Sequence, residues 1–210
     1  MSRSATIKSV KQRLLTAAAE VFFEKGYPAA RISDVVSCAD VARGTFYLYF
    51  KSKKAVFVSL VGIFFDELLA ETLGQNAASG LKDANAMRHQ IRNIWRTILV
   101  YCRTRPQVAA LVLQEATALP KAERGVLAAN YARAADALVH YNRETRRRGI
   151  TRSVDPHLTA CVVIGMVERA VHYAVFVAAE TDIDEIVADL VTIELDGLLA
   201  PEQKTEKEGT

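Results

Sequence analysis

The fold is decided by residues 31–50, which read RISDVVSCADVARGTFYLYF. The first half places apolar residues at helical spacing, at Ile32, Val35, Val36 and Ala39. A short break at residues 40–42 separates it from a second segment that is rich in hydrogen-bonding and aromatic side chains. Two short helices joined by a tight turn, the second able to contact bases and phosphates, are typical of a helix-turn-helix motif over residues 31–50.

The turn and the start of the second helix carry their own predictions. Asp40 stands where a left-handed backbone is expected, which Asp adopts more readily than most residues other than glycine. Ala42 is a poor N-cap compared with Ser or Thr. Gly44 removes a side chain where the helix comes close either to DNA or to a neighbouring element, and Phe46 and Phe50 are expected to pack inward.

The charge distribution agrees with a nucleic-acid-binding N-terminus. The chain has 210 residues and a net charge of +3. Up to Lys54 it holds ten Lys and Arg against four acids, so this quarter carries +6 and the remainder −3. A basic end on a mildly acidic remainder favours contact with DNA, although solvated basic surfaces are also common.

The rest of the chain predicts an all-α fold of about nine helices. Residues 1–7 form a polar, basic arm, and a first helix follows from about Lys8 to Lys25, ended by Gly26. Helices are expected to begin at Ser52, which caps a fourth helix, and at Pro106, Pro120, Asp155-Pro156 and Thr181-Asp182. We expect three domains or segments: 8–68 for DNA binding, 69–200 for a helical effector-binding and dimerisation domain, and 201–210 as a disordered tail.

Residues 8–68 resemble the N-terminal domain of the TetR family of transcriptional regulators. The resemblance is carried by Gly26-Tyr27 and above all by Gly44-Thr45-Phe46-Tyr47-Leu48-Tyr49-Phe50-Lys51-Ser52-Lys53, which fixes glycine, aromatic and lysine positions together. It departs from the family pattern at Arg31, Val36, Asp40 and Ala42. The resemblance implies a homodimeric regulator that binds a palindromic operator in double-stranded DNA and is released by a small-molecule effector.

Candidate DNA contacts follow from residue type together with this resemblance. Arg43 can donate two hydrogen bonds to guanine, and Thr45 can contact a thymine methyl group. Arg43 can alternatively clamp a phosphate, and the resemblance implies that Arg43, Gly44, Thr45 and Tyr47 read the bases. Tyr47, Tyr49, Lys51 and Lys53 are placed to meet phosphates, and Arg31 and Ser33 to hold the flanking backbone, with core packing an alternative for both tyrosines. The full set is Arg31, Ser33, Arg43, Gly44, Thr45, Tyr47, Tyr49, Lys51 and Lys53.

The C-terminal helices suggest a pocket and a dimer interface. Ligand pockets are mainly apolar with a few polar groups, so the pocket candidates are Trp95, Gln114, Tyr131, Tyr141, Met166, Arg169, His172 and Tyr173. The helices after Asp155 and Asp182 hold more apolar residues than one small body can cover. The dimer candidates on them are Val171, Val175, Ile186, Leu190 and Ile193.

Other functions are disfavoured. The chain has four histidines without metal-ligand spacing, and it lacks a phosphate-binding glycine loop, a nucleophile elbow or paired catalytic carboxylates, so we expect no enzyme, metal or cofactor. The N-terminus lacks a signal-peptide core, and the apolar runs 55–65 and 161–167 are too short to span a bilayer, so a cytoplasmic protein without membrane contact is expected. A helical small-molecule enzyme and a pure interaction module remain the competing classes. The expected effector is small and apolar or amphipathic.

Overall fold

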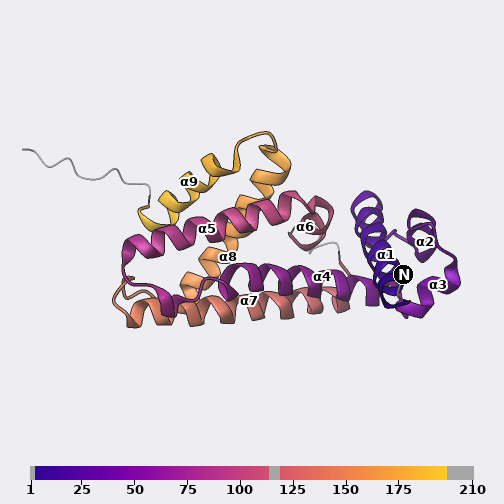
Figure 1. Ribbon diagram of the computed structural model, residues 1–210, viewed down its shortest axis with the longest axis horizontal. Helices are drawn as coiled ribbons and strands as arrows, with labels where there is room; N and C mark the ends of the chain where they lie inside the picture. Colours follow the sequence, from indigo (N-terminus) through magenta and orange to yellow (C-terminus); the bar gives the residue numbers. More distant parts are fainter. Residues whose placement is uncertain (1–2, 114–118, 198–210) are drawn as a thin grey trace, which may run out of the picture.

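The computed structural model describes residues 3–113 and 119–197, and this part contains nine α-helices and no strand, which confirms the all-α prediction (Figure 1). The helices are α1 Arg3–Lys25, α2 Ile32–Cys38, α3 Arg43–Tyr49, α4 Lys53–Leu69, α5 Ala84–Arg103, α6 Pro106–Leu113, α7 Lys121–Arg147, α8 Pro156–His172 and α9 Ile183–Leu195. Short π-helical turns at Ala70–Gly74 and Tyr173–Val177 extend α4 and α8, and a 3-10 turn spans Ala78–Gly80. The expected N-terminal arm is instead part of α1 from Arg3 onward, and the expected tail 201–210 lies outside the described residues.

The head consists of α1, α2 and α3, which lie together at one end of the molecule (Figure 1). Its core is built from large side chains that are almost completely buried, among them Leu14, Phe22 and Tyr27 from α1 and the loop after it. Phe46 and Phe50 complete the core at 0% and 3% exposure, as the sequence predicts. Phe57 of α4 packs against the Tyr27 ring, so α4 is joined to the head from its first turns.

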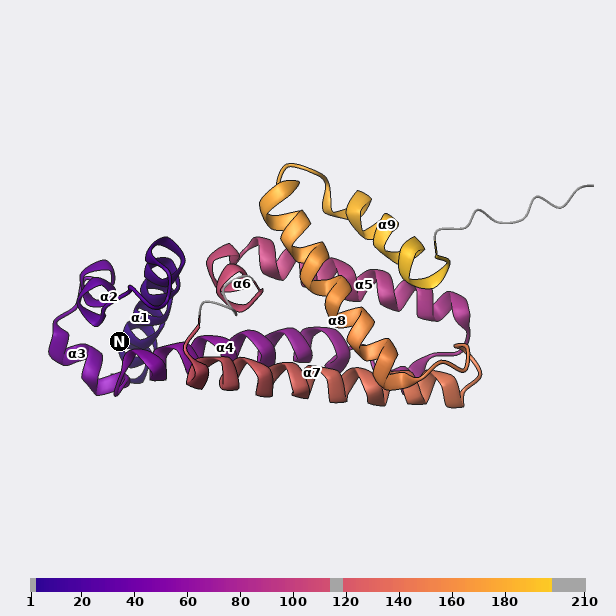
Figure 2. The same cartoon turned by 180° about the vertical axis from the view of Figure 1, so that it is seen from behind.

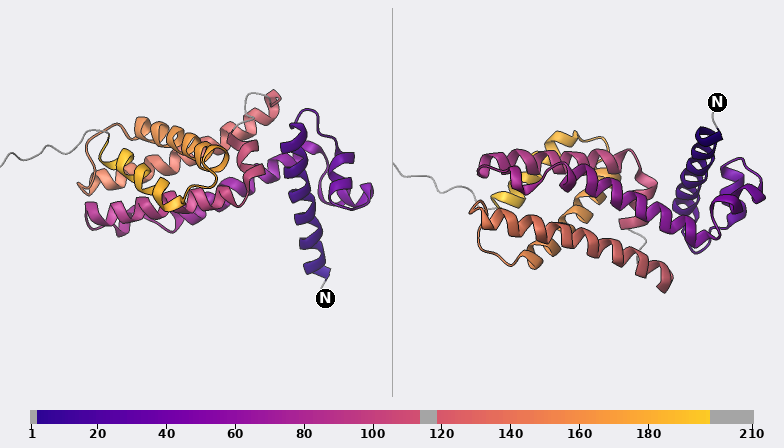
Figure 3. Two further views of the ribbon diagram at one scale, coloured as in Figure 1. Left: turned by 90° about the horizontal axis from the view of Figure 1, so that it is seen from above. Right: turned by 60° about the horizontal axis from the view of Figure 1, so that its bottom comes forward.

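The body is organised around α4 and α7, which run side by side along its length (Figures 1 and 2). α5 lies across from this pair with α9 packed along it, and α8 crosses the body between α7 and α5. The two views in Figure 3 show that α4 is the helix that runs from the head into the body. Ion pairs hold the layers together: Arg133 of α7 contacts Asp66 of α4 at 2.6 Å, and Arg88 of α5 contacts Asp196 just after α9 at 2.6 Å.

Most of the predicted helix boundaries are confirmed, because they depend on local backbone chemistry. Gly26 and Gly149 adopt φ of +73° and +70°, and Asp40 adopts φ of 49°, the left-handed conformation expected for the turn. Ser52 accepts a hydrogen bond from the Ala55 amide at 3.1 Å, and Asp155 accepts from His157 and Leu158. Ala42 begins α3 without a side-chain cap, as its residue type implies.

α8 is longer and more apolar than the apolar run 161–167 in the sequence indicated. Together with the turn after it, it forms a helix, Pro156–Val177, that is long and apolar enough to cross a membrane by length and composition. The charges at Glu168 and Arg169 do not interrupt it. Only 28% of its apolar window is buried inside the protein, so much of its surface faces outward.

Candidate DNA-binding face and ligand cavity

α3 presents one continuous outward face. Arg43, Gly44, Tyr47 and Leu48 are all exposed and recur at the spacing that places residues on one side of a helix. Leu48 is 82% exposed and was not among the sequence-derived candidates; its position four residues after Gly44 was the signal that could have found it. Thr45 and Tyr49 are half-buried at the flank of this face.

Gly44 has no packing reason to lack a side chain. A Cβ atom built at this position meets nothing within 4 Å, and its backbone is not in the left-handed region. Glycine inside a helix costs about 1 kcal/mol relative to alanine. Close approach to a neighbouring element of the same chain therefore does not explain the glycine at this position.

The turn that orients α3 is held by a residue that the sequence did not single out. Arg13 of α1 donates to the carbonyl oxygens of Ala39 at 2.6 Å and Asp40 at 2.9 Å. These carbonyls lie at the end of α2, where helical hydrogen bonding stops. Arg13 thus fixes the angle between α2 and α3 from outside the motif, across a separation of 26 residues in sequence.

The cations predicted to contact DNA fall into two groups. Arg31, Arg43 and Lys51 are exposed, as is the Ser33 side chain. Lys53 is half-buried instead, and its ammonium group donates to the carbonyl oxygens of Tyr27 at 2.7 Å, Pro28 at 3.2 Å and Ala30 at 2.8 Å. It also lies 4.5 Å from the centre of the Tyr27 ring. An ammonium has three donors, and in the structure those of Lys53 are engaged within the protein. We therefore propose a structural role for Lys53 as the alternative to the predicted phosphate contact.

The loop at Tyr27, which Lys53 contacts, also joins the head to the body. The Tyr27 hydroxyl donates to Oε1 of Glu123, in the first turn of α7, at 2.8 Å, and both side chains are buried. Burial, followed by this hydrogen bond and the Glu123 charge, raises the pKa of Tyr27 well above its usual value. The Glu123 carboxylate also opposes the lowering of the Lys53 pKa that burial causes.

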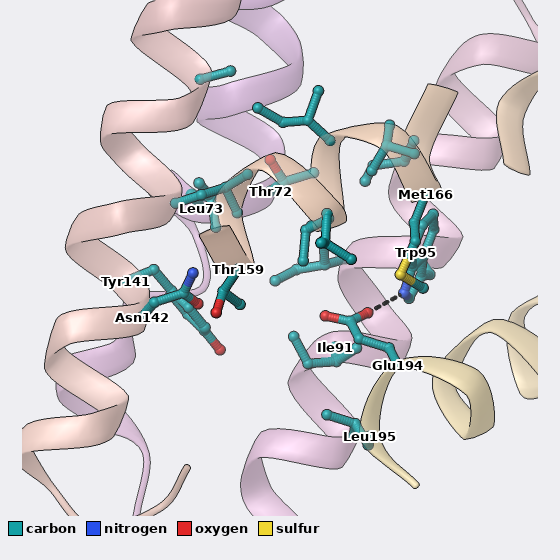
Figure 4. Close-up of a pocket in the computed structure, with 18 of the residues that line it drawn as sticks. Thr72, Leu73, Ile91, Trp95, Tyr141, Asn142, Thr159, Met166, Glu194 and Leu195 are labelled. Atoms are coloured by element: carbon teal, nitrogen blue, oxygen red, sulfur yellow. Dashed lines mark hydrogen bonds between the residues drawn. The ribbon is translucent and has the colours of Figure 1, made fainter. Parts of the chain in front are cut away.

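A cavity of about 870 Å³ lies in the body between α4, α5, α7, α8 and α9 (Figure 4). Its wall is mostly apolar, from Phe65 and Leu68 on α4 to Ile91 on α5 and Val167 on α8. Four of the predicted pocket residues line it: Trp95, Tyr131, Tyr141 and Met166. Its size and lining suit a small organic ligand.

The other predicted pocket residues lie elsewhere. Arg169 and Tyr173 are exposed and His172 is half-buried, and the cavity lining includes none of the three. Arg169 and His172 belong to α8 and Tyr173 to the π-helical turn that follows it. Gln114 lies outside the described residues.

The residues predicted to form the dimer interface differ in how far they are buried. Val171, Val175 and Ile186 are within the core of the single chain at 0%, 9% and 7% exposure, so their side chains are not free to meet a partner. Leu190 packs partly against the same core, and Ile193 is exposed. The apolar side chains that α8 and its extension do expose are different ones: Leu158, Val162, Tyr173 and Val177.

A partly buried carboxylate faces the cavity. Oε2 of Glu194, from α9, accepts a hydrogen bond from Trp95 Nε1 at 2.6 Å (Figure 4). Burial raises the pKa of Glu194, and the Trp95 hydrogen bond opposes this. Burial also raises the pKa of Tyr131, next to the Glu168 carboxylate, and that of Tyr141 to about 12 with a contribution from the Glu194 charge. Sequence reasoning missed Glu194, because an acid in an amphipathic helix usually lies on its solvated side.

Comparison with known proteins identifies the head. Residues 14–60 match the model of the family described as bacterial regulatory proteins, tetR family, which confirms the resemblance. The HTH-type transcriptional regulator YvdT of Bacillus subtilis is 47% identical over 64 residues, covering 30% of this chain and 31% of YvdT. The HTH-type transcriptional repressor DhaR of Mycobacterium sp. is 33% identical over 76 residues, 36% of each chain. The chain therefore spans about a third of the length of these curated relatives.

The similarity of fold extends over the whole body. The transcriptional regulator FadR of Bacillus subtilis, solved in complex with stearoyl-CoA, superposes with a TM-score of 0.72 and 20% identity. The match covers 90% of this chain and 99% of that one. At this identity the likeness establishes the arrangement of helices and leaves the ligand of this chain to be argued from its own residues.

Proposed function

Because this chain carries the N-terminal domain of the TetR family of bacterial regulatory proteins, we propose that it is a homodimeric repressor of transcription. Two heads bind a palindromic operator, and a small-molecule effector in the body releases them. The observation that carries the proposal is the outward face of α3, with Arg43, Tyr47 and an unexplained helical Gly44 side by side.

The α3 face suits the major groove of DNA. Arg43 at the N-terminus of the helix is placed to read a base edge, as recognition helices do with their first residues. Gly44 lets the backbone approach the groove, and Leu48 offers an apolar contact to a thymine methyl group. Tyr47, Lys51 and Arg31 are positioned for phosphates, with Ser33, Thr45 and Tyr49 at the margin.

Gly44→Ala tests this assignment by separating stability from binding. Since the added methyl group meets nothing within the protein, we expect it to stabilise the fold by about 0.5–1 kcal/mol and yet to weaken operator binding. Gly125→Ala is the matched control: Gly125 lies in α7, and its added Cβ also meets nothing within 4 Å. It should gain the same stability without loss of binding.

Urea denaturation and fluorescence anisotropy with labelled operator DNA measure the two quantities. The operator is obtained first by selecting bound fragments from genomic DNA. If Gly44→Ala and Gly125→Ala bind that DNA equally well, the α3 face is not the reading surface.

The second part of the proposal, homodimer formation, is supported by the outward surface of α8. α8 and its extension expose Leu158, Val162, Tyr173 and Val177, of which Leu158 and Val162 also line the cavity. Gly165 lies between them along the helix, and its added Cβ would meet nothing within 4 Å. Contiguous apolar patches on a protein surface mark interaction sites. A two-fold axis through this surface buries it against itself, places Gly165 where two helices approach closely, and brings two heads to one operator.

Gly165→Glu tests the interface, with Gly125→Glu as its control on another helix. Sedimentation equilibrium should give a dimer for the unchanged protein and for Gly125→Glu, and a shift towards monomer for Gly165→Glu. A dimer that persists in both variants would move the interface away from α8.

The third part, effector release, is supported by the cavity and its relation to α4. Phe64, Phe65 and Leu68 of α4 line the cavity, and the same helix reaches the head at Lys53. A ligand that binds better to one position of α4 shifts the population towards it. Release by a factor of about 100 requires about 2.7 kcal/mol of difference in ligand affinity between the two states.

The competing classes predict different observations. An enzyme would convert the bound molecule, which mass spectrometry of a ligand recovered after incubation detects. A pure interaction module would bind a partner protein without operator affinity. As a cytoplasmic regulator, the protein should instead retain specific genomic fragments and lose them when a cavity ligand is added.

A further inference from the structure

The cavity contains polar groups whose hydrogen bonds are incomplete. Glu194 has one oxygen bound to Trp95, while Oε1 accepts no hydrogen bond within the described residues. The hydroxyl of Tyr141 and Nδ2 of Asn142 are buried, and neither forms a hydrogen bond with any residue that the structure describes. All of these side chains line the cavity, with Tyr141 and Asn142 across from Glu194 (Figure 4).

Such groups are rare in folded proteins because leaving them unpaired is costly. Most buried polar atoms have at least one partner, and exceptions indicate a role. Tyr141 and Asn142 present donors, so they require an acceptor on the ligand. Glu194 presents an acceptor with a negative charge, so it requires a donor and favours a positive one. A ligand that satisfies all three carries a cationic donor for Glu194 and an oxygen atom that reaches Tyr141 and Asn142 across the cavity.

The charges around the cavity decide between a cationic and an anionic ligand. Arg88 at its edge is held by both oxygens of Asp196, at 2.9 and 2.6 Å, so that pair contributes little net charge. Arg146 and Arg152 are exposed at the lining, where water and salt screen them. Glu194 and Glu168 both line the cavity, and an anion beside either would add like-charge repulsion in a poorly solvated space.

We propose that the effector is a hydrophobic amine whose protonated amino group binds Glu194 and which also carries an oxygen atom that accepts from Tyr141 and Asn142. This inference rests on the proposed effector site and names its ligand class as long-chain amino alcohols. The apolar chain fills the space lined by Phe65, Leu68 and Ile91. A long-chain carboxylate lacks the donor that Glu194 requires, and an acyl-CoA thioester offers only neutral donors and carries negative phosphates.

Trp95 provides a direct readout, because it is the only tryptophan in the chain and its indole binds Glu194. Its fluorescence is titrated with 1-amino-2-dodecanol, dodecylamine, 1-dodecanol, dodecanoic acid and dodecanoyl-CoA, all below their micelle concentrations. We expect the amino alcohol to bind about tenfold more tightly than 1-dodecanol and the acid to bind more weakly than either. Equal or tighter binding of the acid or the thioester overturns the inference.

Glu194→Gln identifies the group responsible. The amide keeps an oxygen for Trp95 and removes the charge, so affinity for the amines should fall about tenfold while that for 1-dodecanol stays unchanged. Asp184→Asn is the control, because Asp184 is an acid of the same helix paired with Arg96 away from the cavity. Unchanged amine affinity in Glu194→Gln contradicts the role of Glu194.

Operator binding without ligand is measured separately by anisotropy. Loss of the proposed function would appear as absence of operator binding by the unchanged protein, whatever the titrations give. Failure of the ligand assignment would appear in the titrations alone, with operator binding intact.

Discussion

Lys53→Met tests whether this lysine stabilises the head or binds DNA. In the structure its ammonium group donates to three carbonyl oxygens at 2.7, 2.8 and 3.2 Å and lies 4.5 Å from the Tyr27 ring centre. Methionine retains an unbranched apolar side chain of similar length and removes every one of these interactions. The carbonyls of Tyr27 and Ala30 are then left in a part-buried place without their donor.

The expected loss follows from these contacts. Hydrogen bonds from a charged donor contribute about 1.5–3 kcal/mol, and a cation near an aromatic face adds about 0.5–1 kcal/mol. The contacts share one ammonium group, and burial lowers the pKa of Lys53 although the Glu123 charge opposes this, so desolvation offsets part of the gain. We expect a net loss of roughly 2 kcal/mol, or about 4–8 °C in Tm for a chain of this size.

The assay combines stability with the salt dependence of DNA binding. Lys54→Met, at the exposed neighbouring position, should change stability by no more than about 0.5 kcal/mol. Lys51→Ala should lower the slope of log affinity against log salt by about 0.9, as expected for one phosphate contact. Lys53→Met should leave that slope unchanged. Normal stability with a slope reduced by about one would refute the structural role and restore Lys53 as a phosphate ligand.

Three further substitutions address the head, the joint and the cavity. Arg43→Ala should relax the base preference at one operator position and weaken operator binding by about 1–3 kcal/mol. Selection from a randomised operator library measures the preference, and an unchanged preference would contradict the role of Arg43. Tyr27→Phe removes the hydrogen bond to Glu123 and should destabilise the protein by about 1–3 kcal/mol in urea. The pKa of Tyr27 is raised in the folded protein, so its contribution to the free energy of unfolding is complete below the usual tyrosine pKa of about 10 and is lost at higher pH. When the buffer is made alkaline, Tyr27→Phe should therefore lose less stability than the unchanged protein. The raised pKa of Glu194 predicts that Glu194→Gln stabilises the ligand-free protein at neutral pH, with a difference that closes below the usual glutamate pKa of about 4.3; a constant difference across pH would contradict burial of the ionised form.

Local backbone chemistry explains why the helix boundaries could be predicted from the sequence. Gly26 and Asp40 adopt the left-handed conformations that their residue types favour, and Ser52 and Asp155 cap the helices that they precede. Each of these features depends on a few neighbouring residues. The chain-order pattern therefore carries most of the information needed to place them.

Contacts between distant segments could not be predicted in the same way. Arg13 reaches the turn at Asp40, and Lys53 reaches the loop at Tyr27, each across 26 or 27 residues. The residue type of a lysine or arginine does not indicate whether its side chain contacts DNA or a carbonyl group of its own chain. The prediction that Lys53 contacts phosphate rests on residue type, whereas the carbonyl contacts of its side chain depend on tertiary packing.

The candidate cavity was predicted in part because α8 is apolar on more than one side. Met166 faces inward, whereas Tyr173 on the continuation of the same helix is 50% exposed. When apolar residues surround a helix, periodicity no longer indicates which side faces the core. The same ambiguity placed Val171 in the expected dimer interface, although the structure buries it completely.

α4 explains how events in the cavity can reach DNA over a long distance. Its 17 residues from Lys53 to Leu69 form one helix about 26 Å long, with Phe65 at the cavity and Lys53 at the loop of the head. Asp66 and Glu67 attach its far end to α7 and α5 through Arg133 and Tyr101. A packed helix responds to a ligand by moving as a unit, since its interior contacts resist bending. In the proposed mechanism, a small displacement at Phe65 therefore becomes a rotation of the head and changes the separation of two α3 helices on the operator.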